Sequence, residues 1–196
     1  FYFALINKAV LFILLLAIFY QIFNEFYNIL IKIFKNKKKI LINLLGCILI
    51  YLLFTILISW VSLSNQNIQR NIFLLIILIC ISSDVGGYVF GKTFKGKKLS
   101  KISPNKTYSG LFGSYILSIF LVYFIFQKNY SFDFLFLFTI LISTISQSGD
   151  LFISYIKRKA KIKDTAKIIP GHGGLLDRFD GIIFAIPFGI LLFNFL

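Results

Sequence analysis

Four aspartates stand out in this sequence because each lies at or near the end of a long apolar segment. Asp84 occurs in ISSDVGGYVFGK and Asp150 in SQSGDLFISYIKRK, whereas Asp177 and Asp180 occur in GGLLDRFDG. An aspartate within a membrane span costs roughly 2.5–3.5 kcal/mol, so such residues usually face a cavity and have a function. Clustered carboxylates favour a hard cation such as Mg²⁺, held by oxygen and shared with phosphates. The alternative is that each aspartate only pairs with a lysine and holds helices together.

Sequence spacing places these side chains on shared helix faces. Asp150 and Ser154 are four residues apart, and Lys157 and Arg158 follow seven and eight residues after Asp150. Asp177 and Asp180 are three apart, which again corresponds to one face. We expect the two carboxylate-bearing faces to meet across a polar cleft.

The remaining acidic residues are three in number. Asp164 falls in the loop between the two aspartate segments, whereas Glu25 is interpreted as an interfacial residue and Asp133 as an outer-loop residue.

A glycine-rich segment, PGHGG at residues 170–174, directly precedes the expected last helix. Glycines let backbone N–H groups approach an anion closely, and a helix N-terminus favours negative charge. Positive charge is available nearby from Lys157, Arg158, Lys163 and Arg178. Carboxylates, a glycine-rich loop and basic side chains together predict a site that handles phosphates.

A second polar loop contains SPNKT at residues 103–107, which offers Ser103, Lys106 and Thr107 around a proline turn. It is interpreted as a second anion-binding loop, for nucleotide phosphates or a lipid headgroup. The alternative is an ordinary polar loop.

The elements that must position these residues are apolar helices. Hydrophobic residues make up 58% of the chain, against about 45–50% in soluble domains. A span needs roughly 20 apolar residues. The sequence therefore predicts an all-α polytopic membrane protein with about six transmembrane helices, at residues 3–31, 40–63, 71–91, 109–127, 132–156 and 176–196.

Basic residues alternate between the connections of these helices. The first, third and fifth connections are rich in lysine and arginine, whereas Arg70 and Lys128 are alone in the second and fourth. This alternation places the first, third and fifth connections on the cytoplasmic side. The net charge of +14 is thereby explained by topology and the lipid bilayer, without a nucleic-acid partner.

The expected organisation has N-terminal transmembrane helices at 1–70 and a catalytic membrane region at 71–196, with cytoplasmic loops at 92–108 and 157–175. Because the chain begins with Phe1 and contains no methionine, we expect its natural start and earlier helices to be missing. Cys47 and Cys80 lie in apolar runs and are interpreted as small buried hydrophobic residues.

The segment from about residue 82 to 181 resembles the phosphatidate cytidylyltransferases, also called CDP-diacylglycerol synthases. The resemblance is carried by SDVGGYVFGK…SPNKTYSG, by GDLFISYIKR and by the residues from Lys163 to Asp180 that include PGHGGLLDRFD. Two positions depart from the family pattern: members often have an acidic or amide residue at Ser109 and glutamate at Ile153.

The resemblance implies transfer of the cytidylyl group of CTP to phosphatidate, giving CDP-diacylglycerol and pyrophosphate, with Mg²⁺. It implies a multi-pass protein of the bacterial inner membrane whose active site faces the cytoplasm. A second cation and a homodimer stay open.

The resemblance also suggests a role for each candidate residue. Expected metal ligands are Asp150 and Asp177, followed by Asp164 and Asp180. Phosphates are assigned to Lys157, Arg158, Lys163 and Arg178, and His172 to a hydrogen bond with, or protonation of, the leaving pyrophosphate. The expected substrate-binding residues are Asp84, Ser103, Lys106, Thr107, Ser154, Gly171, Gly173 and Gly174.

Three other functions compete with this interpretation. A CTP-dependent lipid alcohol kinase would release CDP and transfer a phosphoryl group instead. A cation transporter would need polar residues across the full bilayer, whereas here they gather at one side. A structural subunit would have no chemistry of its own.

Overall fold

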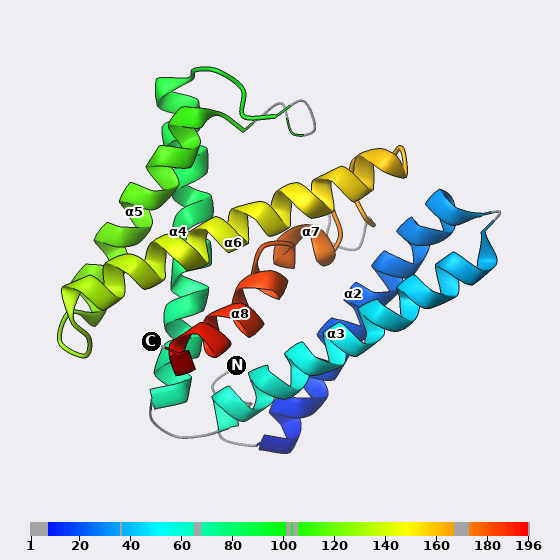
Figure 1. Ribbon diagram of the computed structural model, residues 1–196, viewed down its shortest axis with the longest axis horizontal. Coiled ribbons are helices and arrows are strands. Elements are labelled where there is room, and N and C mark those ends of the chain that lie inside the picture. Colours follow the sequence, from blue (N-terminus) through cyan, green and yellow to red (C-terminus); the bar gives the residue numbers. More distant parts are fainter. Residues whose placement is uncertain are drawn as a thin grey trace. The chain divides into compact units, whose positions relative to one another are not determined.

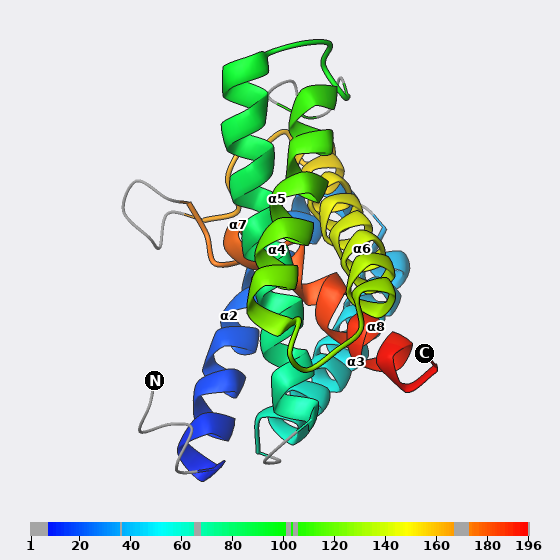
Figure 2. The same cartoon turned by 90° about the vertical axis from the view of Figure 1, so that its left-hand side faces the viewer.

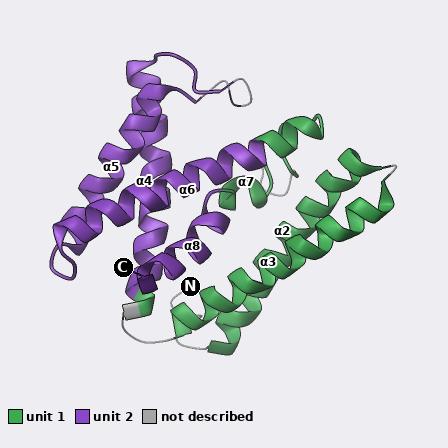
Figure 3. Cartoon of the chain, in the orientation of Figure 1, with its two compact units in different colours: residues 1–70, 155–180 green, residues 71–154, 181–196 purple. Residues whose placement is uncertain are grey.

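The computed structural model describes residues 8–35, 37–64, 68–100, 103, 106–166 and 173–195. Over these residues the chain is helical, without β-strands, apart from an isolated bridge between Lys98 and Thr107 (Figure 1). The helices divide between two compact units (Figure 3). Unit 1 comprises residues 1–70 and 155–180, and unit 2 comprises residues 71–154 and 181–196.

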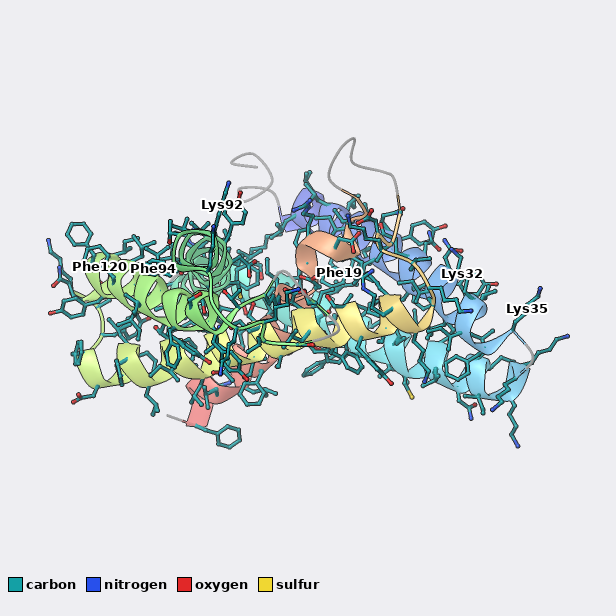
Figure 4. All side chains as sticks on the ribbon, turned by 90° about the horizontal axis from the view of Figure 1, so that it is seen from above. Phe19, Lys32, Lys35, Lys92, Phe94 and Phe120 are labelled. Atoms are coloured by element: carbon teal, nitrogen blue, oxygen red, sulfur yellow. The ribbon has the colours of Figure 1, made fainter. Side chains whose placement is uncertain are left out.

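Unit 1 is built on an antiparallel pair of helices, α2 (Lys8–Phe34) and α3 (Lys38–Ser64) (Figure 1). At the end of this pair opposite the turn, Trp60 of α3 contacts α2. Its ring Nε1 donates to the Lys8 carbonyl at 3.2 Å, and its ring meets that of Phe12 edge-on. At the opposite end, Lys32 and Lys35 project from the end of α2 that leads into α3 (Figure 4). The end of the hairpin at its turn is therefore basic, whereas aromatic side chains meet at the other end.

One face of α2 is buried along its whole length. The buried side chains recur every three or four residues, as expected for one face of a helix; they are Leu11, Leu15, Phe19, Ile22, Glu25, Phe26, Ile29 and Leu30. The short helix α7 (Leu176–Phe179) packs against this helix in unit 1. Unit 1 thus joins residues of the expected N-terminal helices with part of the expected catalytic region.

In unit 2, α4 (Ile68–Phe94) and α5 (Tyr108–Phe126) run side by side and antiparallel (Figures 1 and 2). Glycines allow their backbones to approach closely: a Cβ added at Gly86 would lie 2.6 Å from the Gly113 carbonyl oxygen. A Cβ at Gly110 would lie equally close to the Gly87 carbonyl oxygen. Such close approach of small residues is the usual basis of helix packing in membranes.

The rest of unit 2 consists of most of α6 (Phe132–Lys159) and all of α8 (Ile182–Phe195). Gly189 of α8 packs so closely on α4 that a Cβ there would lie 2.6 Å from the Ile76 side chain. Phe193 meets the ring of Phe134 edge-on at 5.9 Å. These contacts join α4, α6 and α8 around a core that contains Ile76 and Phe138.

The expected fold class is confirmed. Five helices, α2 to α6, are long and apolar enough to cross a membrane, so this is a multi-pass membrane protein. The expected sixth span, 176–196, differs because it is divided into α7 and α8. Gly181 lies at the break, where a Cβ would meet the Ser146 carbonyl oxygen at 2.9 Å, and Pro187 within α8 cannot donate a helix hydrogen bond. With 14 residues α8 is about 21 Å long, shorter than the hydrocarbon core.

Candidate active site

In unit 1, Asp177 from the first turn of α7 pairs with Lys157 from the last turn of α6. The Lys157 Nζ donates to Asp177 Oδ1 at 2.8 Å, and each side chain is only 10% exposed. Taking two charges out of water is costly, and their attraction offsets that cost only while the pair stays intact. The structure therefore fixes the Lys157 ammonium on one carboxylate oxygen.

Three donors lie within hydrogen-bond distance of the other oxygen of Asp177. The donors are the backbone N–H of Thr165 at 2.9 Å, its hydroxyl at 3.0 Å and the backbone N–H of Gly174 at 3.0 Å. Burial would raise the pKa of this carboxyl, but the bonds from Lys157, Thr165 and Gly174 outweigh it and lower the pKa below its ordinary value. Asp177 is therefore held as a carboxylate.

The end of the glycine-rich segment is shaped around this carboxylate. Gly173 has a φ of +82°, a conformation that favours glycine, and a Cβ there would lie 2.8 Å from Asp177 Oδ2 and 3.6 Å from the Asp164 Cβ. Gly173 therefore lies against Asp177 of α7 and Asp164 of the preceding loop. Pro170, Gly171 and His172 lie outside the described residues.

Glu25 joins this cluster from α2, where it is completely buried. Its Oε1 accepts from the Leu175 N–H at 2.9 Å, and its Oε2 accepts from the Leu176 N–H at 3.0 Å and from the Thr165 hydroxyl. Glu25, interpreted from the sequence as an interfacial residue, is thus enclosed by protein groups. The carboxylate satisfies backbone donors at the start of α7, which have no partner within such a short helix.

Unit 2 holds a second polar cluster, around Asp150 of α6. Lys106 forms an ion pair with Asp150 Oδ2, and the Ser154 hydroxyl donates to Asp150 Oδ1 at 3.4 Å. Asp84 of α4 lies within electrostatic range of both Asp150 and Lys106. Two carboxylates and one ammonium thus gather within this unit.

The loop that carries Lys106 is ordered by its backbone. Lys106 donates its N–H to the Ser103 carbonyl at 3.1 Å and accepts from the Leu99 N–H at 2.8 Å. Thr107 caps α5 by accepting from the Gly110 N–H at 3.1 Å. Ser109, one of the two departures from the family pattern, donates to the Lys95 carbonyl, so it too supports this loop. The second departure, Ile153, is buried in unit 2.

A chain of hydroxyl groups continues deeper into unit 2. Gln147, one turn before Asp150 on α6, donates to Ser114 at 2.7 Å and to Ser143 at 3.0 Å, and Ser143 lies 2.9 Å from Ser83. Because each of these groups has a partner, the cluster links α4, α5 and α6 at low cost. These hydrogen bonds tie the turn of α6 that precedes Asp150 to the neighbouring helices.

The carboxylate oxygens of both clusters are suitable ligands for Mg²⁺. This ion takes oxygen ligands and is often bound by one or two carboxylates together with substrate phosphates. In unit 2, Asp150 with Asp84 could supply such a pair. In unit 1, Asp177 could bind the metal only by giving up some of the hydrogen bonds that its carboxylate now accepts. Among the described residues, no three histidine, cysteine or acidic side chains come together as a metal site.

Comparison with known proteins identifies the chain's family. The model of the cytidylyltransferase family matches residues 1–196. The chain belongs to the cytidylyltransferase family. A phosphatidate cytidylyltransferase of Rickettsia typhi is 38% identical over 198 residues, covering 95% of this chain and 83% of that protein. The Rickettsia felis protein of the same name is 39% identical over 92% of this chain and 80% of its own length.

A relative from another genus matches over a shorter region. A phosphatidate cytidylyltransferase of Bacillus subtilis is 40% identical over 111 residues, or 55% of this chain and 41% of that protein. The family inferred from the aspartate and glycine motifs is confirmed.

In this cytidylyltransferase family member, the candidate residues fall into both units. Those in unit 1 are Lys157, Arg158, Lys163, Asp164, Gly173, Gly174, Asp177, Arg178 and Asp180, and those in unit 2 are Asp84, Ser103, Lys106, Thr107, Asp150 and Ser154. The structure brings Lys157 onto Asp177 and Lys106 onto Asp150. Arg158, next to Lys157, instead faces outward and donates to the Ile162 carbonyl at 3.0 Å. Gly171 and His172 lie outside the described residues.

Sequence reasoning missed Glu25 and Thr165 in this cytidylyltransferase. For Glu25 a signal was present: it falls three residues after Ile22 and four before Ile29, on the buried face of α2. A carboxylate in that register of an apolar helix needs buried donors. No local pattern marked Thr165, because its role arises from two carboxylates that are distant in sequence.

Proposed function

We propose that this chain is an enzyme that transfers the cytidylyl group of CTP to phosphatidate, giving CDP-diacylglycerol and pyrophosphate. The observation that carries the proposal is the similarity to phosphatidate cytidylyltransferases along nearly the whole chain. The site is consistent with it, since each unit holds a carboxylate paired with a lysine, Asp177 with Lys157 in unit 1 and Asp150 with Lys106 in unit 2. Among the described residues, no feature favours a kinase, a transporter or a subunit without activity.

The reaction is a displacement at phosphorus. A phosphate oxygen of phosphatidate forms a bond to the α-phosphorus of CTP, and the bond from that phosphorus to the bridging oxygen breaks, so that pyrophosphate leaves with the electron pair. A phosphate monoester has a second pKa of about 6 and is already anionic near neutral pH. The protein therefore needs to position two anions and neutralise charge, and it needs no strong base.

Mg²⁺ would supply charge neutralisation on the phosphates of CTP. As candidate ligands we assign Asp150 in unit 2 and, in unit 1, Asp177 followed by Asp164 and Asp180; Asp84, near Asp150, is assigned to substrate binding. A second cation is compatible with carboxylates in both units.

The basic residues would bind the phosphates. In the structure Lys157 pairs with Asp177 and Lys106 with Asp150, so each ammonium would bind a phosphate by sharing it with its aspartate or by leaving that aspartate. Arg158, Lys163 and Arg178 would add positive charge around the pyrophosphate. We assign to His172 a hydrogen bond to that leaving group, or its protonation.

The remaining substrate contacts would come from the two loops and from Ser154 of α6. Gly171, Gly173 and Gly174 would shape the loop around the CTP phosphates. Ser103, Thr107 and Ser154 would bind substrate beside Lys106 and Asp150.

The proposed location is the bacterial inner membrane, with the active site facing the cytoplasm, where CTP is available. The alternating basic connections support this orientation. Alkylation of single cysteines tests it, at Lys95→Cys for the third connection and Asn129→Cys for the fourth, in a background without Cys47 and Cys80. Labelling of Asn129→Cys from the cytoplasmic side would contradict the orientation. We also propose that the protein forms a homodimer. The mass of the purified protein in detergent tests this.

The decisive experiment supplies the purified chain in lipid vesicles with phosphatidate, Mg²⁺ and CTP labelled at the α- or the γ-phosphate. Label from the α-phosphate is expected in the lipid product, with label from the γ-phosphate in pyrophosphate. Label from the γ-phosphate in the lipid would show a kinase and overturn the proposal. Asp150→Asn should abolish turnover, whereas Asp133→Asn, the same change at an exposed position, should retain it.

A further inference from the structure

Glu25 is a buried carboxylate that none of the steps above uses. It lies in α2, far from the aspartate motifs in sequence, and its side chain is 0% exposed. Four donors surround it: the N–H groups of Leu175 and Leu176, the Thr165 hydroxyl and, at 3.4 Å, the side-chain amide of Gln21. Leu175 and Leu176 directly precede Asp177 in the chain, and Thr165 contacts the Asp177 carboxylate.

The Thr165 hydroxyl connects the two carboxylates of unit 1. It lies within hydrogen-bond distance of Glu25 Oε2 and, at 3.0 Å, of Asp177 Oδ2. A hydroxyl carries a single hydrogen, so it can donate fully to only one of these oxygens at a time. Glu25 thereby influences how strongly Thr165 holds Asp177.

Gly174 connects the same two carboxylates by packing. Its N–H donates to Asp177 Oδ2 at 3.0 Å, while a Cβ on the same residue would collide with the Glu25 carboxylate and lie 2.8 Å from its Cδ atom. The backbone here is therefore clamped between the two side chains. A shift of Glu25 would move the backbone that determines where Asp177 lies.

We propose that Glu25 is a positioning residue for the Asp177 site. Its carboxylate orders the backbone of residues 174–176 and the Thr165 hydroxyl, so that the Asp177 carboxylate and the Lys157 ammonium keep one geometry. The effect on catalysis rests on the proposed function, because it assumes that Asp177 and Lys157 act on the substrates.

The competing explanation is that Glu25 only holds α7 on α2 and contributes stability alone. The two explanations differ in what a mild substitution does. A purely structural role predicts a less stable protein whose folded molecules turn over normally. A positioning role predicts a lower kcat in the molecules that remain folded, with little change in KM.

Glu25→Gln is the sharpest variant because it keeps the shape of the side chain and removes one acceptor oxygen. The Leu175 and Leu176 N–H groups bond to different oxygens of Glu25, so in either orientation of the glutamine amide one N–H faces an NH₂ group. Asp133→Asn is the matched control, because it removes the same charge isosterically at the exposed first turn of α6.

Both variants and the unaltered chain are compared in lipid vesicles with CTP, phosphatidate and Mg²⁺, and their backbone amide exchange is followed by mass spectrometry. For Glu25→Gln we expect kcat to fall about 100-fold, as for a displacement of about 1 Å, with KM within about threefold. Amides of residues 173–177 should exchange faster. Asp133→Asn should match the unaltered chain in both measurements.

Thr165→Val supplies a second test that leaves the buried carboxylate in place. Valine keeps the volume and removes only the hydroxyl, so kcat should fall and the amides of 173–177 should again exchange faster. Combined with Glu25→Gln, it should lower kcat little further, because both changes break the same connection. Should Glu25→Gln fail to fold, Thr165→Val decides the matter by the same two readouts.

The proposal is overturned if Glu25→Gln and Thr165→Val retain kcat within twofold of the unaltered chain, or if kcat falls while exchange at 173–177 is unchanged. An unaltered chain that is inactive towards CTP and phosphatidate would instead refute the proposed function. Amide exchange would still show whether Glu25 orders the segment that carries Asp177.

Discussion

The buried pair of Lys157 and Asp177 should make unit 1 sensitive to either partner alone and tolerant of losing both. With each side chain 10% exposed, removing one partner leaves a buried charge without compensation, at a cost of about 3–5 kcal/mol. The cost of Lys157→Met should lie near the lower end of this range, because the Asp177 carboxylate keeps three uncharged hydrogen-bond donors. The cost of Asp177→Asn should lie near the upper end of this range. The Lys157 ammonium loses its counter-charge, and the NH₂ group of the new asparagine faces backbone N–H donors.

The double variant Lys157→Met with Asp177→Asn buries no net charge. The asparagine carbonyl can turn towards the N–H groups of Thr165 and Gly174, and its NH₂ group then faces the methionine. One unsatisfied polar group costs about 1–3 kcal/mol. The double variant should therefore be at least about 3 kcal/mol more stable than the sum of the single losses predicts, and all three variants should lack normal turnover.

Trp60 provides the assay, because it is the sole tryptophan of the chain and lies in unit 1. Its fluorescence is followed during denaturant unfolding in mild detergent, and the free energy of unfolding is compared across the four proteins. Single losses below about 1 kcal/mol would show that the pair is hydrated and that the reasoning from burial is wrong. A double variant with the summed loss would show that the two side chains do not interact.

Further outcomes follow from the same geometry. Gly174→Ala should lower turnover by at least tenfold, about 1.4 kcal/mol, because its Cβ would collide with Glu25 and Thr165; Gly46→Ala, which meets nothing within 4 Å, is the control and should stay active. Removal of Mg²⁺ by a chelator should abolish turnover reversibly, and activity that persisted would exclude a metal requirement. Because the pKa of Asp177 is lowered from 3.8 on folding, its contribution to stability should be complete above about pH 4 and decline as the pH falls further. Asp177→Asn should show a smaller loss of unfolding free energy over that acid range, and an equal loss would contradict the assignment.

The sequence predicted the helices well because apolar length is a direct physical signal. Long apolar runs between lysine clusters gave spans close to α3, α4, α5 and α6, since a helix in lipid must satisfy its own backbone. The division of the last span was missed. It depends on the packing of Gly181 against Ser146, which is a contact between segments distant in sequence.

The sequence also identified the aspartates as the chemically important residues, but it did not specify their partners. Helix spacing predicted a shared face for Asp150, Ser154 and Lys157, and the structure pairs Ser154 with Asp150 and Lys157 with Asp177. Which lysine meets which aspartate depends on tertiary contacts. Lys106 reaches Asp150 from another loop, and spacing along one helix carries no information about such a contact.

The glycine-rich segment illustrates how one residue can satisfy two demands. From the sequence alone, the N–H of Gly174 is expected to donate to a substrate phosphate. In the structure it already donates to Asp177 at 3.0 Å. A phosphate can bind that N–H only if the Asp177 carboxylate withdraws from it, so phosphate and carboxylate compete for one donor. Because Glu25 lies directly against the same glycine, the backbone has little room to follow a departing Asp177. Binding of a phosphate here should therefore require Asp177 to exchange the glycine N–H for another partner while the loop itself stays in place.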